Sequence, residues 1–230
     1  MRSAFGSLLL LLMLAPPVGA WSAQPSAPGG DGQGTPPVRP AIRLILTPTA
    51  RPLKSGEGYV SLHELFFPML GIGVTDHFSI AGGVSVVPGA GSRVMIISSA
   101  YTPVRAGDLD LSCGLFYMKK TGGRGTPIPY VNATYGDAGL SATLGSGWRP
   151  GGGDGQGTLF FIGGFLLPLG DDTELISDFI APPNADPAVV SLGTRVHANK
   201  LTAEFALIVP WNVRGTPGVP LPWTSVSIEF

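Results

Sequence analysis

The sequence predicts an all-β fold: an antiparallel transmembrane β-barrel of about twelve strands, preceded by a cleaved signal peptide and a short disordered linker. Three observations predict this fold. The chain begins with an export signal, it contains few charged residues, and apolar and polar side chains alternate in several of the strand-like segments that follow residue 42. Alternation in segments of about ten residues, separated by turn residues, is typical of strands that cross a bilayer in a barrel.

Residues 1–20 have the pattern of a secretory signal peptide. Arg2 supplies the positive charge, Leu8–Leu14 is an uncharged apolar run, and Val18–Ala20 offers small side chains for cleavage. The apolar run is too short to span a bilayer as a helix, which disfavours the alternative of a retained membrane anchor. We expect cleavage after residue 20. A cut after Ala23 fits less well, because it places a bulky tryptophan near the cleavage point.

Residues 21–41 are rich in proline and glycine, which predicts a flexible linker between the signal peptide and a barrel domain over 42–230. A motif at 28–35 recurs at 150–158. This repeat could be a calcium-binding glycine–aspartate repeat or a low-complexity loop. Two isolated copies do not form the stacked array that such calcium-binding repeats need, which favours the loop.

Composition separates this chain from an ordinary soluble domain. Hydrophobic residues make up 44% of the sequence, charged residues only 13%, and the mean hydropathy is +0.31, whereas soluble domains carry about 25% charged residues. There is no run of 18 apolar residues that would form a membrane-spanning helix. The net charge of −1 excludes a basic nucleic-acid-binding surface, and the single Cys113 excludes a disulfide framework.

The strands are predicted from runs of alternating or apolar residues bounded by turn signals. In one of them Leu201, Phe205 and Leu207 alternate with Thr202 and Glu204. The long predicted strand over 58–73 contains a proline, so we expect a bulge or a bend there. The predicted strands cover residues 42–49, 58–73, 78–87, 93–102, 108–118, 127–135, 138–147, 158–167, 172–180, 189–196, 200–209 and 222–230.

The predicted connections alternate between short turns and mostly longer loops rich in glycine or proline, as in outer-membrane barrels. With twelve strands the two sets fall on opposite rims and both chain ends lie on the short-turn side. The short set is 75–77, 103–107, 136–137, 168–171 and 197–199. The longer set is 51–56, 88–92, 119–126, 148–157, 181–187 and 211–220.

The last predicted strand carries a second specific signal. Val226, Ile228 and Phe230 occupy alternate positions, and the sequence stops at the phenylalanine. This pattern resembles the signal by which bacterial outer-membrane barrels are recognised for assembly. The resemblance implies two partners, the barrel-assembly machinery and outer-membrane lipid. In water an exposed hydrophobic last strand is an aggregation hazard, although a soluble protein can also end on a strand.

A further resemblance covers the stretch from Pro48 to Gly89. The segment Lys54–Tyr59 precedes a strand, and Gly73–Ser79 forms a Gly-Val-Thr-Asp-His-Phe-Ser turn. This arrangement is similar to uncharacterised, porin-like outer-membrane β-barrels of Gram-negative bacteria. The chain departs from their pattern at Ser55, which interrupts a Lys-Gly step, and at a histidine where asparagine is usual. The resemblance implies a barrel in the outer membrane and no particular activity.

No catalytic, cofactor-binding or metal site is predicted, and we expect the protein not to be an enzyme. Ser61 and His63 are two residues apart on one strand and share a face. A membrane-embedded lipid hydrolase would also need an orienting acid within hydrogen-bond reach, and the adjacent Glu64 points to the opposite face. His77 and His197 fall in predicted turns, and no spacing of ligands indicates zinc.

Charged residues on the inferred inner faces are the candidate lumen lining. They either line a narrow watery pore or pair across the lumen and fill it. Acidic residues outnumber basic ones six to three, which weakly favours cations if the lumen is open. The set is Arg43, Asp108, Asp110, Glu174, Asp178, Arg195, Lys200, Glu204 and Glu229.

Three functions are compatible with these features. The first is a narrow passive pore for small solutes. The second is a closed structural barrel whose long loops, such as 148–157 and 211–220, meet partners. The third is a soluble secreted β-sandwich or lipocalin-like binder, which the low charge and the terminal Phe230 disfavour.

Overall fold

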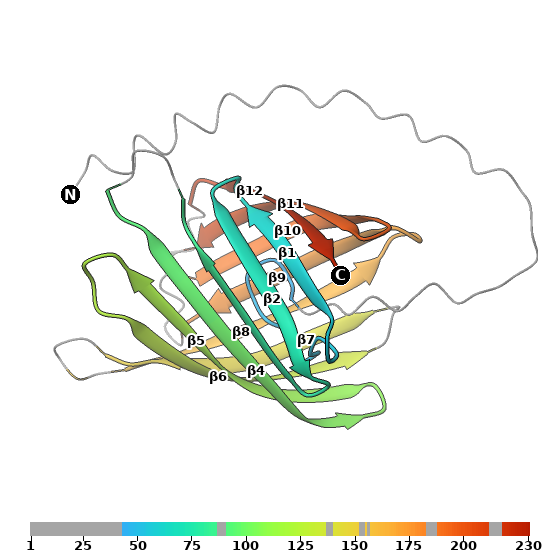
Figure 1. Cartoon of the computed structure of the whole chain (residues 1–230), viewed down its shortest axis with the longest axis horizontal. Helices are drawn as coiled ribbons and strands as arrows, with labels where there is room; N and C mark the ends of the chain where they lie inside the picture. The colour runs from blue at the N-terminus through green and yellow to red at the C-terminus, as the bar shows by residue number, and fades with distance from the viewer. Residues whose placement is uncertain are drawn as a thin grey trace, which may run out of the picture. The chain divides into compact units, whose positions relative to one another are not determined.

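The computed structural model describes residues 43–86, 91–136, 140–151, 155, 157–182, 188–211 and 218–230. These residues form twelve β-strands, labelled in Figure 1. The predicted signal peptide (1–20) and linker (21–41) lie outside the described residues. The strands are β1 (Gly58–His63), β2 (Phe67–Thr75), β3 (Phe78–Val84), β4 (Val94–Ala106), β5 (Leu109–Lys120), β6 (Thr126–Gly136), β7 (Ser141–Arg149), β8 (Thr158–Pro168), β9 (Thr173–Ala181), β10 (Ala188–Ala198), β11 (Leu201–Trp211) and β12 (Leu221–Glu229).

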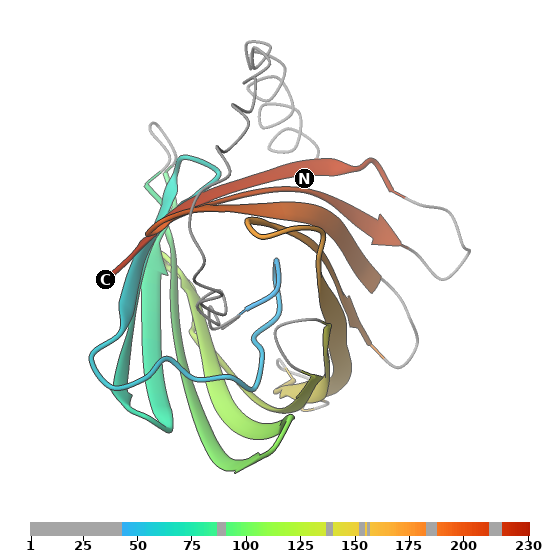
Figure 2. The ribbon, with the colours of Figure 1, turned by 90° about the vertical axis from the view of Figure 1, so that its right-hand side faces the viewer.

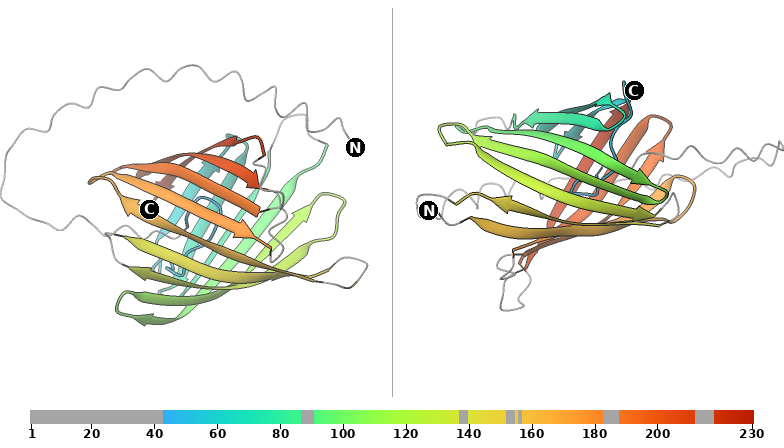
Figure 3. Two further views of the ribbon diagram at one scale, coloured as in Figure 1. Left: turned by 180° about the vertical axis from the view of Figure 1, so that it is seen from behind. Right: turned by 90° about the horizontal axis from the view of Figure 1, so that it is seen from below.

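The strands form one closed antiparallel barrel. Each strand pairs with its neighbours in sequence, and β12 pairs with β1 to complete the ring (Figures 2 and 3). Gly58 and Phe230 finish the closure, because each backbone amide donates to the other residue's carbonyl at 2.9 Å. Closure satisfies the backbone polar groups of both terminal strands, as a bilayer requires. The predicted fold class, an antiparallel barrel of twelve strands, is confirmed.

The predicted strand over 42–49 is wrong. Residues 43–53 lie inside the barrel instead, and residues 54–57 continue to the short-turn rim; Figure 2 shows this stretch as the blue segment within the ring, with one isolated bridge between Arg43 and Pro48. We call residues 43–57 the internal segment. The apolar run in this stretch resembles a strand, but its side chains pack against the inner wall rather than facing lipid.

A second error compensates for the first. The predicted long strand over 58–73 is two strands, β1 and β2, joined by a tight turn at 64–66. Glu64 and Leu65 adopt positive φ angles of 50° and 60° there. Neither residue type favours this backbone conformation, so the sequence carries no turn signal at this point. The total of twelve strands is therefore correct, although two of the twelve predicted strands, 42–49 and 58–73, are not.

The two rims differ as predicted. One rim carries the short connections, such as 76–77, 107–108 and 199–200, together with the start of β1 and the end of β12. The strand ends that border most of the longer connections, such as Val84 and Val94, which belong to paired strands β3 and β4, lie at the opposite rim. Residues 51–56, predicted as one of the longer loops, instead lie at the short-turn rim, where the Ser55 amide donates to the Asp76 carboxylate at 3.0 Å.

Side chains alternate between the two faces of the wall. Leu144, Val131 and Phe205 point outward with 65%, 56% and 53% of their surface exposed, whereas Thr134 and Thr143 are buried inside. An apolar outer band and a polar interior are the reverse of a soluble protein and fit a barrel whose outer surface meets lipid. Within the described ranges the structure contains no helix long and apolar enough to cross a membrane.

Candidate functional site

The inner wall carries an apolar patch that receives the start of the internal segment. Leu44 and Ile45 are 1% and 3% exposed, and they pack against Leu166, Ile176 and Ala206 of the wall. Fully burying side chains of this size stabilises a contact by about 1.5–3 kcal/mol each. An apolar patch inside a largely polar lumen therefore indicates that the segment is an integral part of the folded barrel.

Asp178 on β9 is the main acceptor for the backbone of the internal segment. Its Oδ2 accepts hydrogen bonds from the amides of Leu46 at 2.6 Å and Thr47 at 2.9 Å, and from the Thr47 hydroxyl at 3.2 Å. Its Oδ1 accepts a hydrogen bond from the hydroxyl of Ser191 on β10. Asp178 is 1% exposed. These donors therefore replace the hydrogen bonds to water that the carboxylate loses on burial.

Glu204 on β11 binds two arginines. Its Oε2 lies 3.0 Å from Nη2 of Arg43, and its Oε1 lies 2.7 Å from Nη2 of Arg195. The hydroxyl of Ser225 donates to Oε2 at 2.6 Å. Arg195 also donates to the backbone carbonyl of Arg43 at 2.8 Å, and its Nη1 lies 3.5 Å from Glu174. Two arginines and two glutamates thus form a cluster without net charge.

A second set of contacts holds the middle of the internal segment against β4 and β6. The Ala50 amide donates to the Thr134 hydroxyl at 2.8 Å, and the Ala50 carbonyl accepts from the Thr102 hydroxyl at 2.8 Å. The side-chain amide of Asn132 donates to the Pro48 carbonyl at 2.8 Å. Buried backbone groups outside regular structure need such partners, and the wall threonines and asparagine supply them.

Asp110 on β5 provides an ionic contact for the same region. Its carboxylate lies 3.7 Å from Nε of Arg51 on the internal segment and 3.4 Å from Nε of Arg105 on β4. Arg105 is 43% exposed on its side chain, so its pair with Asp110 is weaker than a buried pair. Arg51 is better shielded, and it also donates to the Gly136 carbonyl.

The end of the internal segment passes directly over Gly73 of β2. The Gly56 amide donates to the Gly73 carbonyl at 3.0 Å, and the Gly73 amide donates to the Glu57 carbonyl at 2.8 Å. A Cβ atom at Gly73 would lie 2.0 Å from the Lys54 carbonyl oxygen and 2.7 Å from that of Leu53. Only glycine at position 73 allows the internal segment to pass this close to β2, so this strand is adapted to the internal segment.

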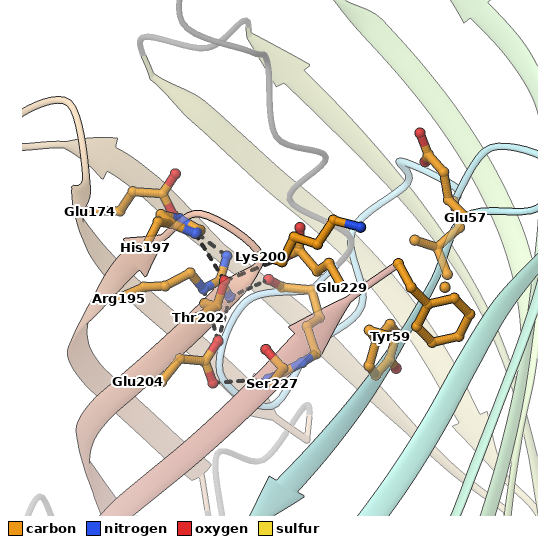
Figure 4. Close-up of a pocket in the computed structure, with 14 residues that line it drawn as sticks. Glu57, Tyr59, Glu174, Arg195, His197, Lys200, Thr202, Glu204, Ser227 and Glu229 are labelled. Carbon is orange, nitrogen blue, oxygen red and sulfur yellow. Dashed lines mark hydrogen bonds and ion pairs between the residues drawn. The ribbon is translucent and has the colours of Figure 1, made fainter.

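A cavity of about 320 Å³ lies between the internal segment and the wall at the short-turn rim. Figure 4 shows Glu174 and His197 on one side of it and Tyr59 and Glu57 on the other. Arg43, Arg195 and Glu204 border it as well, so the arginine–glutamate cluster faces the cavity. The complete lining is Arg43, Leu53, Glu57, Gly58, Tyr59, Glu174, Arg195, His197, Lys200, Thr202, Glu204, Ser227, Glu229 and Phe230.

The predicted lumen charges fall into three groups. Asp110, Glu174, Asp178, Arg195, Glu204 and Glu229 lie on strands and make contacts inside the barrel. Arg43 is inside too, but on the internal segment rather than on a strand. The prediction that Asp108 lines the lumen is wrong, because this residue is exposed in the turn between β4 and β5. Lys200 is exposed at the rim, where it borders the cavity.

Arg51 and Glu57, two charged residues of the internal segment, were not predicted to line the lumen. They lie in or beside a predicted connection, outside the inferred lumen faces. Proline gives no signal that would find the segment, because β6 itself contains Pro127 and Pro129 two residues apart.

The predicted Ser61–His63 pair does form, with Ser61 Oγ 2.9 Å from His63 Nε2. However, among the described residues His63 Nδ1 has no hydrogen-bond partner, so no acid orients the ring. Glu64 instead accepts a hydrogen bond from the Thr224 amide at 2.6 Å. Burial raises the pKa of Glu64, and this amide opposes that rise. A hydrolytic triad is therefore not assembled. The described residues also contain no cluster that could hold a metal ion.

The barrel is similar to solved porins. The KdgM porin superposes with a TM-score of 0.52 and 10% identity over 76% of this chain and 96% of that one, and it has also been solved in complex with disordered oligogalacturonate. The NanC porin gives a TM-score of 0.54 and 8% identity over 76% of this chain and 98% of that one. No protein-family model and no curated protein matches the sequence. These similarities show that the chain has a porin fold.

Proposed function

We propose that this protein is an outer-membrane channel for small solutes whose lumen is narrowed by the internal segment. The observation that supports this proposal most is how the lumen is filled. Small barrels are filled by the side chains of their own strands, whereas large porins leave a channel. Here residues 43–57, a separate stretch of chain, occupy the lumen, and a cavity of about 320 Å³ remains beside them.

The charges of the wall favour cations. Five carboxylates, Asp110, Glu174, Asp178, Glu204 and Glu229, contribute to the lumen from the strands, against two arginines of the strands, the buried Arg195 and the more exposed Arg105. Rings of acidic side chains favour cations in pores. The oligogalacturonate of the KdgM complex is an acidic oligosaccharide. We propose that this channel accepts neutral or cationic small solutes instead.

The proposed location follows from the fold and from the sequence. An apolar outer band suits the hydrocarbon core of a bilayer, and the signal-peptide pattern over 1–20 would export the chain. We propose that the terminal strand, with Val226, Ile228 and Phe230 facing outward, is recognised by the barrel-assembly machinery. The outer-membrane lipid would then contact the same outward face.

Planar-bilayer recording of the refolded full chain tests the channel. We expect small, discrete conductance steps and a reversal potential in a KCl gradient that indicates cation preference. A variant in which Asp110 and Glu229 are both glutamine should lose much of that preference, while Asp108→Asn should not, because Asp108 is exposed in a turn. Anion preference in the unmodified protein would overturn the proposed selectivity.

A closed structural barrel is the second candidate, and one observation favours it. The internal segment is held by apolar packing, ion pairs and hydrogen bonds along its length. The same recording separates the two candidates if a variant with weakened contacts is included. Silence from both the unmodified protein and Asp178→Ala would support the closed barrel. Carbonate extraction would separate both from a soluble secreted protein, which would be washed from membranes.

A further inference from the structure

The position of Arg43 indicates what the wall is suited to bind. Its guanidinium Nη2 lies 3.0 Å from Oε2 of Glu204 and 3.4 Å from the Ser225 hydroxyl. Its Nη1 donates to the carbonyls of Leu44 and Ile45, both at 3.3 Å. Arg43 belongs to a segment with no strand pairing to this part of the wall. The wall therefore receives a guanidinium from outside the sheet, at a buried carboxylate and a hydroxyl.

The cavity gives a soluble molecule access to the same carboxylate. Arg43 and Glu204 both line it, and it extends to the short-turn rim, where the exposed Lys200 and Phe230 border it. Its volume of about 320 Å³ equals that of roughly ten waters at about 30 Å³ each. A small organic solute fits in this space beside Arg43 without displacing any strand.

The charge of the lining favours a cation. Four glutamates face three cationic side chains, so the lining carries a net charge of −1 when His197 is neutral. Arg43, Arg195, Glu174 and Glu204 largely neutralise one another. Glu229, whose Oε1 accepts one 3.3 Å hydrogen bond from Thr202 within the described residues, keeps acceptor capacity. Tyr59 adds an aromatic ring, which attracts cations to its face.

A second, independent feature of the cavity points to a polar ligand. His197 is 7% exposed, and its Nδ1 is within 3.0 Å of the Thr202 hydroxyl. Its Nε2 lies 3.2 Å from Oε2 of Glu174, which also lies 3.5 Å from Nη1 of Arg195, yet within the described part of the chain these contacts do not have hydrogen-bond geometry. Buried polar atoms that lack a well-directed hydrogen bond are costly, and both residues line the cavity. A donor placed there would give the carboxylate oxygen a directed hydrogen bond.

We propose that this cavity is a binding site for a small guanidinium or ammonium solute, and that Arg43 is a tethered competitor that occupies part of it. The inference deepens the proposed channel function, because it names the class of solute that enters from the short-turn rim. A solute cation would pair with Glu229 and compete with Arg43 for Glu204. When the Arg43 side chain moves out of the cavity, the net charge of the lining side chains becomes −2, which strengthens the electrostatic attraction to the solute cation.

Equilibrium dialysis of the folded full chain in detergent tests this site without any ion flow. The probe is radiolabelled methylguanidinium, with methylurea as the neutral isostere. We expect Arg43→Gln to tighten methylguanidinium binding and Glu204→Gln to weaken it, by about tenfold if one charged hydrogen bond is lost. Glu229→Gln, at the half-buried rim of the cavity, should weaken binding even if Glu204→Gln fails to fold.

Glu64→Gln is the matched control, because this carboxylate lies at the opposite rim and bonds to Thr224. It should leave binding unchanged. Equal binding of methylurea, no binding in the unmodified protein and in Arg43→Gln, or weaker binding in Arg43→Gln would each overturn the site. If only the channel proposal is wrong, the barrel will show no conductance in a planar bilayer but will still bind methylguanidinium.

Discussion

Thr47 and Asp178 are 131 residues apart, yet the amide and the hydroxyl of Thr47 both donate to the same carboxylate oxygen, at 2.9 Å and 3.2 Å. This contact fastens the internal segment to β9 in the interior of the barrel. Because Thr47 is 1% exposed and Asp178 is 1% exposed, water cannot easily replace either partner. The segment therefore depends on this carboxylate for its position.

The substitution Asp178→Ala should loosen the internal segment. It removes the acceptor for two backbone amides and for the hydroxyls of Thr47 and Ser191, and each buried donor left without a partner costs about 1–3 kcal/mol. We expect single-channel conductance to rise several-fold in a planar bilayer. Asp108→Ala is the control, since Asp108 is exposed in a turn. Equal conductance in both variants would show that the segment does not restrict the channel.

Gly73→Ala should displace the end of the same segment. The new methyl group would lie 2.0 Å from the Lys54 carbonyl oxygen, so the segment must move. We expect faster trypsin cleavage after Lys54 in the folded barrel, identified by mass spectrometry. Gly82→Ala is the matched control, because its nearest neighbour would be at an ordinary 3.4 Å. Identical digestion of the two variants would contradict the observed packing.

Leu144→Arg tests whether the outer face meets lipid. Leu144 is 65% exposed in the middle of β7, and an arginine at the bilayer midplane destabilises a barrel by about 2–4 kcal/mol. We expect the free energy of unfolding from liposomes to fall by about that amount. Leu169→Arg, in a rim turn, should cost only about 0–1 kcal/mol. A soluble β-sandwich would tolerate both changes similarly.

Deletion of Phe230 should impair closure. The deletion removes both backbone hydrogen bonds with Gly58 and the ring that lies over it. We expect a smaller fraction of heat-modifiable, folded barrel on an unheated SDS gel and accumulation of unassembled chain in the periplasm. Phe230→Tyr keeps the ring and the backbone and should assemble normally. Normal assembly of the deletion would refute the assembly role of the terminus.

The sequence by itself determined the wall of this protein. A strand in a barrel must present apolar side chains outward and polar ones inward, so period-two alternation such as that around Glu204 and Phe205 is a local property that can be read without a structure. The alternation of turns and loops follows from the same antiparallel order. Low charge content followed from the lipid-facing surface, which needs no charged residues.

The tertiary structure alone decided what fills the barrel. Residues 43–49 contain an apolar run, Leu44–Leu46, that resembles part of a strand, and only the apolar patch formed by Leu166, Ile176 and Ala206 shows that they pack inside. The three residues of that patch lie on strands β8, β9 and β11, and no local sequence pattern predicts that they come together. Arg43, which pairs with Glu204, and Leu46, whose amide bonds to Asp178, are likewise 161 and 132 residues away from those carboxylates in sequence. A buried charge is defined by the groups around it, and closure of the ring brings those groups together.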